Sequence, residues 1–161
     1  MIATLPPKRS TCAACLRPSS ACICQWITPT PHEVDVVILQ HPLEVHNAKG
    51  SARLLHLSLP HSRLLTGEAF TPQAMQTLLE GPRRAVLLYP ETSDFPDMPD
   101  TPTPPGLGPE RLRSPAQLRL IVLDGTWRKS RKMLHQNPQL QHLPRLSLRN
   151  LPASHYLIRK A

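Results

Sequence analysis

Four cysteines near the start of the chain are its clearest candidates for metal binding. The pattern Cys12-x2-Cys15-x6-Cys22-x-Cys24 places all four cysteines within thirteen residues. Zn²⁺ prefers four soft ligands in a tetrahedron, and four thiolates leave no coordination position for water. The spacing therefore predicts a structural zinc site. The alternatives are two disulfides, a redox pair or unrelated buried thiols, and disulfides are disfavoured because no secretion signal precedes the cysteines.

Asp124 is a second candidate for chemistry, in the segment Asp124-Gly125-Thr126-Trp127. It directly follows the aliphatic run Leu120–Leu123 and is the only acidic residue among the last 51. A carboxylate at the end of a buried strand can accept a proton or orient a base. The structural alternative is that Asp124 or Thr126 only caps the following helix. Trp127 either stacks on an aromatic ring of a ligand or fills the core.

Basic residues are concentrated in the last third of the chain. The net charge is +8, and residues 111–161 carry eleven basic side chains against one acidic side chain. The helix expected after Asp124 holds Arg128, Lys129, Arg131 and Lys132, and spacings of three and four bring Arg128, Arg131 and Lys132 onto one face. This pattern predicts contacts with the phosphates of a nucleic acid. The alternative is an ordinary solvated basic surface.

Short aliphatic runs alternate with helical patterns, which predicts an α/β fold with a mainly parallel sheet flanked by helices. The predicted strands are Val34–Gln40, Ala85–Tyr89, Leu118–Asp124 and Arg145–Leu148. The predicted helices are Ala48–Leu57, Pro72–Leu79 with Thr71 as its cap, and Thr126–Gln136. Ligands bind beyond the carboxyl ends of the strands in such sheets, so the residues following each strand are candidates for the site.

The 161 residues divide by composition into a cysteine-bearing knuckle, residues 1–30, and an α/β domain, residues 31–161. Within the domain, residues 90–115 are rich in proline and acid, and we expect a surface loop there. The longest aliphatic runs fall far short of the ~20 apolar residues that a membrane span needs. Residues 1–10 lack the apolar region of a leader, so the sequence predicts a cytoplasmic protein, and it indicates no obligate protein partner.

The sequence resembles the DTW-domain family, the tRNA-uridine aminocarboxypropyltransferases, on five motifs in the same order. The first is the cysteine pattern described above. The others are Gln40-His41-Pro42-x-Glu44-x2-Asn47-x2-Gly50-Ser51-Ala52-Arg53-Leu54-Leu55, Tyr89-Pro90, Asp124-Gly125-Thr126-Trp127 and Ser154-x-Tyr156-x-Ile158-Arg159-Lys160. They span nearly the whole chain, and together they are far more specific than Asp-x-Thr-Trp alone.

The resemblance implies a SPOUT-like fold with a knotted cofactor site. It also implies transfer of the 3-amino-3-carboxypropyl group from S-adenosylmethionine to N3 of a tRNA uridine. An RNA methyltransferase of the same fold is an alternative, because the carbon aligned with the nucleophile decides which group moves. Family members usually continue past the last motif with helical sequence that helps close the cofactor site, whereas this chain stops at Ala161. A truncated product is therefore expected, and a non-catalytic RNA-binding zinc protein is the third alternative.

The motifs also assign roles to individual residues. Asp124, Thr126 and Trp127 are expected at the reaction centre, where Asp124 accepts the proton of uracil N3 or orients the base. The residues expected to bind the cofactor are Gln40, His41, Glu44, Asn47, Arg53, Tyr89, Pro90 and Tyr156. Arg53 would clamp a carboxylate or a phosphate, unless it only forms a surface ion pair with Glu44.

Overall fold

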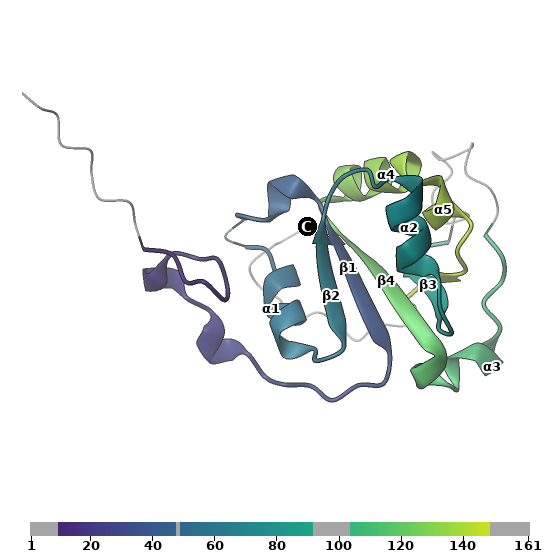
Figure 1. Cartoon of the computed structure of the whole chain (residues 1–161), viewed down its shortest axis with the longest axis horizontal. Helices are drawn as coiled ribbons and strands as arrows, with labels where there is room; N and C mark the ends of the chain where they lie inside the picture. Colours follow the sequence, from purple (N-terminus) through teal and green to yellow (C-terminus); the bar gives the residue numbers. More distant parts are fainter. Residues whose placement is uncertain (1–9, 48, 92–103, 149–161) are drawn as a thin grey trace, which may run out of the picture.

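The chain folds around one parallel β-sheet, which confirms the predicted α/β class (Figure 1). The computed structural model describes residues 10–47, 49–91 and 104–148. Five strands lie in the order β2-β1-β4-β3-β5, and every neighbouring pair is parallel. The strands are β1 (Asp35–Gln40), β2 (Ser62–Thr66), β3 (Arg84–Leu88), β4 (Leu118–Asp124) and β5 (Arg145–Leu146).

Four of these strands are predicted from the sequence, and one is missed. β4 has the expected bounds, β1 and β3 differ by one residue at their ends, and β5 ends two residues early. The missed strand is β2, whose sequence Ser62-Arg63-Leu64-Leu65-Thr66 has only two apolar residues and no alternation. β2 is an edge strand that pairs only with β1, and its residues stay partly exposed, so it needs no continuous apolar run.

Two helices begin at the threonines that the sequence marks as caps. The helix α2 (Pro72–Leu79) follows Thr71, whose hydroxyl accepts from the backbone N–H of Ala74. The helix α4 (Trp127–Gln136) begins after Thr126, which caps it in the same way, and α5 (Pro138–Gln141) follows after one residue. Among the described residues, no helix has both the length and the apolar surface that crossing a bilayer requires.

Two predicted segments differ from the structure. The predicted helix Ala48–Leu57 is α1 (Ala52–Ser58), which begins later than predicted because a turn at Gly50 precedes it. The predicted first residue, Ala48, lies outside the described residues. The end of the predicted loop 90–115 is helical and not irregular, since α3 (Pro109–Leu112) and a 3-10 helix at Pro115–Gln117 form there. A proline at the first position of each helix fixes the required backbone angle. Residues 92–103 lie outside the described residues.

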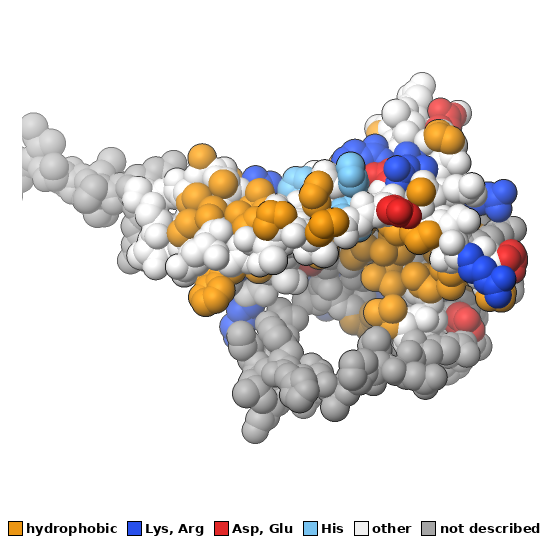
Figure 2. Space-filling view, turned by 90° about the horizontal axis from the view of Figure 1, so that it is seen from below, with side chains coloured by type: hydrophobic (Ala, Val, Ile, Leu, Met, Phe, Trp, Pro, Cys, Tyr) orange, Lys and Arg blue, Asp and Glu red, His pale blue; other side chains and the backbone are white. Residues whose placement is uncertain are grey.

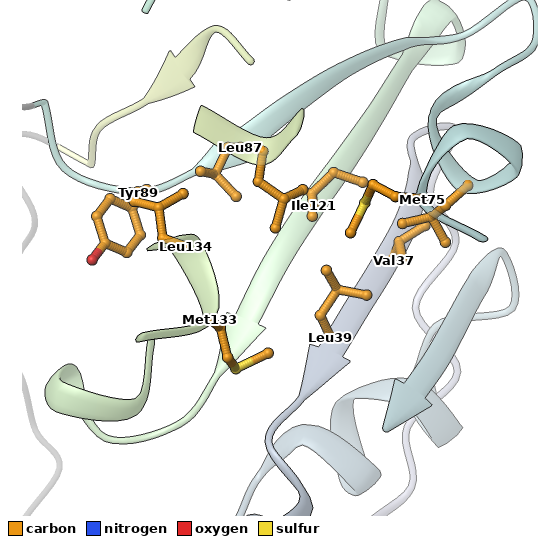
Figure 3. Close-up of a cluster of buried hydrophobic side chains, with 10 residues drawn as sticks. Val37, Leu39, Met75, Leu87, Tyr89, Ile121, Met133 and Leu134 are labelled. Carbon is orange, nitrogen blue, oxygen red and sulfur yellow. The ribbon is translucent and has the colours of Figure 1, made fainter. Parts of the chain in front are cut away.

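Helices cover both faces of the sheet, and the larger core lies on the face of α2, α4 and α5. Its buried members are Val37, Leu39, Met75, Leu78, Leu87, Tyr89, Ile121, Met133, Leu134 and Leu140 (Figure 3). The opposite face packs Val36 and Ile38 against Ala52 of α1. Because successive side chains of a strand alternate between faces, β1 contributes to both cores and is buried on each side.

The cysteine segment lies beside α1 (Figure 1), and hydrogen bonds join it to α1 and to the turn before this helix. Arg17 Nη2 donates to the Gly50 carbonyl at 2.8 Å, and Arg53 Nε donates to the Ala14 carbonyl at 2.9 Å. Arg53 therefore holds the knuckle, and it does not form the ion pair with Glu44 that the sequence left as an alternative.

Charged residues at the amino ends of the strands neutralise one another. Asp35 accepts from Arg119 at 2.6 Å and from Arg63 at 3.1 Å. Arg119 also donates to the carbonyl of Glu80 at 2.8 Å, just past the end of α2. Because Arg63 and Arg119 contact Asp35, part of the basic excess holds the fold together.

Figure 2 shows the molecule from below, where basic, acidic, histidine and hydrophobic side chains share the surface.

Asn137, between α4 and α5, fastens the segment after β2 to the core. Its side chain is 1% exposed and makes three hydrogen bonds to backbone groups. Its amide nitrogen donates to the carbonyls of Glu68 at 2.9 Å and Met133 at 2.6 Å, and its oxygen accepts from the Phe70 N–H at 2.9 Å.

We expect Asn137→Ala to lower the free energy of unfolding by about 3 kcal/mol, because buried backbone groups lose their partners. Chemical denaturation measures this loss. Gln136→Ala, which removes an exposed amide one residue earlier, is the matched control and should change stability by less than about 0.5 kcal/mol. Equal effects of the two variants would show that the Asn137 bonds do not stabilise the fold.

Candidate active site

The carboxyl ends of β1, β4 and β3 lie side by side at one edge of the sheet, where α4 begins (Figure 1). The register of β1 and β4 places Gln40 opposite Asp124. Gln40 Nε2 donates to Asp124 Oδ2 at 2.9 Å, and the His41 N–H donates to the Asp124 carbonyl at 2.9 Å. Gln40 is buried, so this bond fixes the orientation of the Asp124 carboxylate at the edge where parallel sheets bind ligands.

The turn from Asp124 to α4 is tight, and Thr126 is its helix cap. The Thr126 hydroxyl accepts from the backbone N–H of Lys129, so Asp124 is not the N-cap residue. Gly125 allows the close approach, because a β-carbon there would lie 3.1 Å from the β-carbon of Lys129. The structure thus separates the two roles that the sequence left open for this turn, with capping assigned to Thr126.

Two neighbouring pockets open at this edge. The smaller, of about 200 Å³, is lined by Glu44, Lys49, Gly50, Ser51 and the turn Asp124-Gly125-Thr126. The larger, of about 470 Å³, lies between the cysteine segment and the residues after β1. Gln40, Asn47 and Arg53 line it, together with Glu44. Four of the predicted cofactor residues therefore face one cavity, and Asp124 faces the cavity beside it.

Glu44 is a buried carboxylate that links the loop after β1 to α4. Its Oε1 accepts from Lys129 Nζ at 2.7 Å, and its Oε2 accepts from Asn47 Nδ2 at 2.6 Å. Lys129 was predicted to bind RNA, and in this structure its ammonium group contacts Glu44. Buried carboxylates are seldom tolerated without such partners, so the ion pair explains how Glu44 can lie at the boundary of both pockets.

Glu68 is a site residue that the sequence analysis missed, because it follows the missed strand β2. Glu68 Oε1 accepts from Lys132 Nζ at 2.9 Å and contacts His41 Nε2 at 3.0 Å. The hydrogen bond from Lys132, followed by that from His41, lowers the pKa of the Glu68 carboxyl. The Leu43 N–H donates to His41 Nδ1, which leaves Nε2 as the donor to Glu68. His41 thus holds the turn and does not line either pocket.

The basic side chains of α4 fall into two pairs. Lys129 and Lys132 contact the carboxylates of Glu44 and Glu68. Arg128 is exposed and Arg131 partly buried, and no carboxylate of the described residues lies within 4.0 Å of either guanidinium. Arg128 and Arg131 therefore have more of their charge available to an outside anion.

Trp127 and Tyr89 stack at the carboxyl end of β3. Their ring centroids lie 5.3 Å apart with an interplanar angle of 15°, and Trp127 is 41% exposed. Tyr89 is buried, and Leu134 is drawn next to it in Figure 3. Arg145 is a site residue that the sequence does not reveal. Its Cζ lies 5.3 Å from the centre of the Tyr89 ring, and its Nη1 donates to the Pro90 carbonyl at 3.1 Å. The predicted residue Tyr156 lies outside the described residues.

The four cysteines come together as free thiols, with geometry suited to a metal ion. All four sulfur atoms lie within 4.8 Å of one another. The Sγ atoms of Cys12 and Cys24 are 3.6 Å apart, and those of Cys15 and Cys22 are 3.7 Å apart. Zn–S bonds of about 2.3 Å in a tetrahedron place sulfur atoms about 3.8 Å apart. The disulfides considered as an alternative are not formed.

The thiols differ in how readily they ionise. Backbone hydrogen bonding, chiefly from Ile23, lowers the pKa of Cys15 to about 6. The neighbouring thiols, first of all Cys22, raise the pKa of Cys24 to about 12. Four thiolates at these distances repel one another, so a cation between them is required for all four to ionise. The donor set therefore fits a divalent metal.

Comparisons with known proteins point to one family. The model of the DTW domain matches residues 9–161. The tRNA-uridine aminocarboxypropyltransferase 2 of Drosophila melanogaster is 28% identical over 162 residues, covering 96% of this chain and 60% of that protein. The protein of the same name in Macaca fascicularis is 25% identical, covering 94% of this chain and 50% of that protein. The tRNA-uridine aminocarboxypropyltransferase A of Arabidopsis thaliana is 29% identical over 137 residues, covering 79% of this chain and 51% of that protein.

No solved structure gives a significant match. The chain spans 50 to 60% of the length of these three relatives. The match to the family model, in contrast, covers nearly all of this chain and includes the cysteine segment, both pockets and the turn at Asp124. The chain therefore belongs to the DTW-domain family.

Proposed function

We propose that the protein transfers the 3-amino-3-carboxypropyl group of S-adenosylmethionine to N3 of a uridine in tRNA. Membership of the DTW-domain family and the names of the relatives support this reaction. The observation that carries it here is the Asp124 carboxylate, oriented by Gln40 and facing a pocket beside the basic helix α4. A base, an adjoining cavity and cations for a polyanion thus occur together.

Asp124 would serve as the base. Uracil N3 carries a proton at neutral pH and is a poor nucleophile until that proton leaves. In the proposed step this proton goes to the free oxygen of Asp124 as N3 bonds to the γ-carbon of the donor. The bond between that carbon and sulfur breaks, and its electron pair stays on the sulfur of methylthioadenosine. Gln40 holds the second carboxylate oxygen, so the base is oriented before the substrate arrives.

The donor would be held by residues on both sides of Asp124. In the sheet β4 lies between β1 and β3, so the residues after β1 and those after β3 flank Asp124. Gln40, Asn47 and Arg53 line the larger pocket on one side, and Tyr89 and Pro90 lie on the other. His41 and Glu44 would act through their neighbours, by holding the turn and Lys129 in place.

The tRNA would lie along α4. Arg128, Lys129, Arg131 and Lys132 supply the positive charge, and Arg128 and Arg131 would contribute most because their guanidinium groups have no carboxylate partner among the described residues. Trp127, which is 41% exposed and stacks on Tyr89, would contact a base with its exposed atoms.

A structural zinc ion would hold the knuckle together. The four ligands would be Cys12, Cys15, Cys22 and Cys24, and zinc would cross-link the segment and take no part in the chemistry at Asp124.

The all-parallel strand order also supports a SPOUT-like fold, in which we place the knotted cofactor site at the carboxyl ends of β3 and β4.

The carboxylate of Asp124 is tested by Asp124→Asn, because the Asn oxygen can still accept from Gln40 while its amide is a far weaker base. We expect the rate of methylthioadenosine release in the presence of tRNA to fall by about 10²- to 10⁴-fold, and the free energy of unfolding to change little. Glu110→Gln, at an exposed carboxylate on α3, is the control and should keep full activity. Activity of Asp124→Asn within about threefold of the parent argues against proton transfer. Formation of S-adenosylhomocysteine instead would identify a methyltransferase.

The role of α4 is tested by the salt dependence of tRNA binding. We expect Arg128→Ala and Arg131→Ala each to weaken binding across RNA sequences and to reduce the slope of log Kd against log salt by about one. Arg113→Ala, at an exposed arginine after α3, is the matched control. An unchanged salt slope in the protein that carries both Arg128→Ala and Arg131→Ala would show that α4 does not bind the RNA.

The metal site is tested by measuring zinc in protein expressed with zinc in excess. We expect one zinc per chain, and less than half of that in Cys15→Ser, together with a lower melting temperature. Ser20→Ala, an exposed position in the same segment, should change neither. A Cys15→Ser protein with unchanged stability and metal content is the result that contradicts a structural site.

A further inference from the structure

Arg145 is a buried cation whose hydrogen-bonding capacity is only partly used. The residue is 6% exposed, and its Nη1 donates to the Pro90 carbonyl at 3.1 Å. Its Nε and Nη2 are buried and have no hydrogen-bond partner among the residues that the structure describes. The Tyr89 hydroxyl is also buried, and no group in the described part of the chain bonds to it; the centre of its ring lies 5.3 Å from Arg145 Cζ.

Unsatisfied buried donors are rare in native proteins, because each has given up its bonds to water without a replacement. A buried guanidinium normally lies beside an anion. Arg119, which is also buried, follows the rule because it contacts Asp35. Burial lowers the pKa of Arg145, which is what a cation without an anionic partner shows. Arg145 is thus the exception that a bound anion would explain.

The unpartnered groups of Arg145 have the geometry of a carboxylate receptor. Nε–H and Nη2–H point from the same edge of the planar guanidinium, and two parallel donors at this spacing match the two oxygens of a carboxylate. The remaining nitrogen is held by Pro90, and the Tyr89 ring lies against the group. The edge is therefore oriented before any ligand binds.

Arg145 is also linked to the proposed reaction centre through the rings of Tyr89 and Trp127. It pairs with Leu87 of β3, and its side chain reaches Pro90, beyond the carboxyl end of that strand. Tyr89 joins it to Trp127, which belongs to the same turn as Asp124. A ligand group on Arg145 would therefore be one aromatic ring away from that turn.

We propose that the Nε–Nη2 edge of Arg145 binds the carboxylate of the aminocarboxypropyl group that is transferred. The inference rests on the proposed function and deepens it. A carboxylate held at one end of this group restricts where its γ-carbon can lie, and alignment decides whether that carbon or the methyl carbon reacts. Arg145 would thus favour aminocarboxypropyl transfer over methylation. A tRNA phosphate has the same anionic chemistry, and the test separates the two sources.

The experiment compares S-adenosylmethionine with its decarboxylated analogue by calorimetric titration. We expect the parent protein to bind S-adenosylmethionine about 10- to 100-fold more tightly than the analogue. In Arg145→Met this preference should disappear, because only the ligand that has a carboxylate loses its partner. Arg145→Lys keeps the charge without the paired donors and should lose most of the preference. Arg84→Met, at an exposed arginine at the start of β3, should keep it.

Each other outcome overturns the inference in a recognisable way. Equal weakening of both ligands in Arg145→Met assigns the residue a structural role, and unchanged binding excludes the contact. Loss of tRNA affinity with a reduced salt slope, at constant affinity for S-adenosylmethionine, identifies a phosphate as the ligand. A parent protein that binds neither ligand overturns the proposed function together with this inference. Where thermal melting shows that Arg145→Met is unfolded, Arg145→Lys decides the test.

Discussion

The site depends on the parallel register of β1 and β4, because this register places Gln40 beside Asp124. Six residue pairs connect the strands, from Asp35 and Arg119 to Gln40 and Asp124. A slip of one residue would turn each side chain to the opposite face of the sheet. Polar contacts at both ends of the pair oppose such a slip, since Asp35 accepts from Arg119 and Gln40 donates to Asp124. The orientation of one carboxylate is therefore a property of the whole sheet.

Ion pairs fix the remaining parts of the site relative to this register. Glu44 follows β1 and Glu68 follows β2, and each contacts a lysine of α4. Asn137 adds backbone bonds between the end of α4 and the segment that holds Glu68. The start of α4, where Trp127 lies, is thus tied to loops from two other strands. Part of the positive charge on this helix therefore serves the architecture.

Local patterns made much of this arrangement predictable. Continuous aliphatic runs identify buried strands such as β4, and Thr126 followed by a helical pattern identifies a cap, because both depend on neighbours in sequence. The sequence does not reveal β2 because this strand stays partly exposed and has no continuous aliphatic run. Glu68 was missed with it. Arg145 was missed because its contacts with Tyr89 and Pro90 span more than fifty residues. The clustering of the four thiols was predictable from their spacing, whereas the stacking of Trp127 on Tyr89 was not.

Glu44 lines both pockets and has its charge balanced by Lys129. Two molecules bound in the two pockets would therefore share one carboxylate, and each would alter the field that the other experiences. Thermodynamic reciprocity then requires that whatever the first does to the affinity of the second, the second does equally to the first. Ligands in the two pockets would be energetically coupled without touching each other, and the size of that coupling would not depend on the order in which they bind.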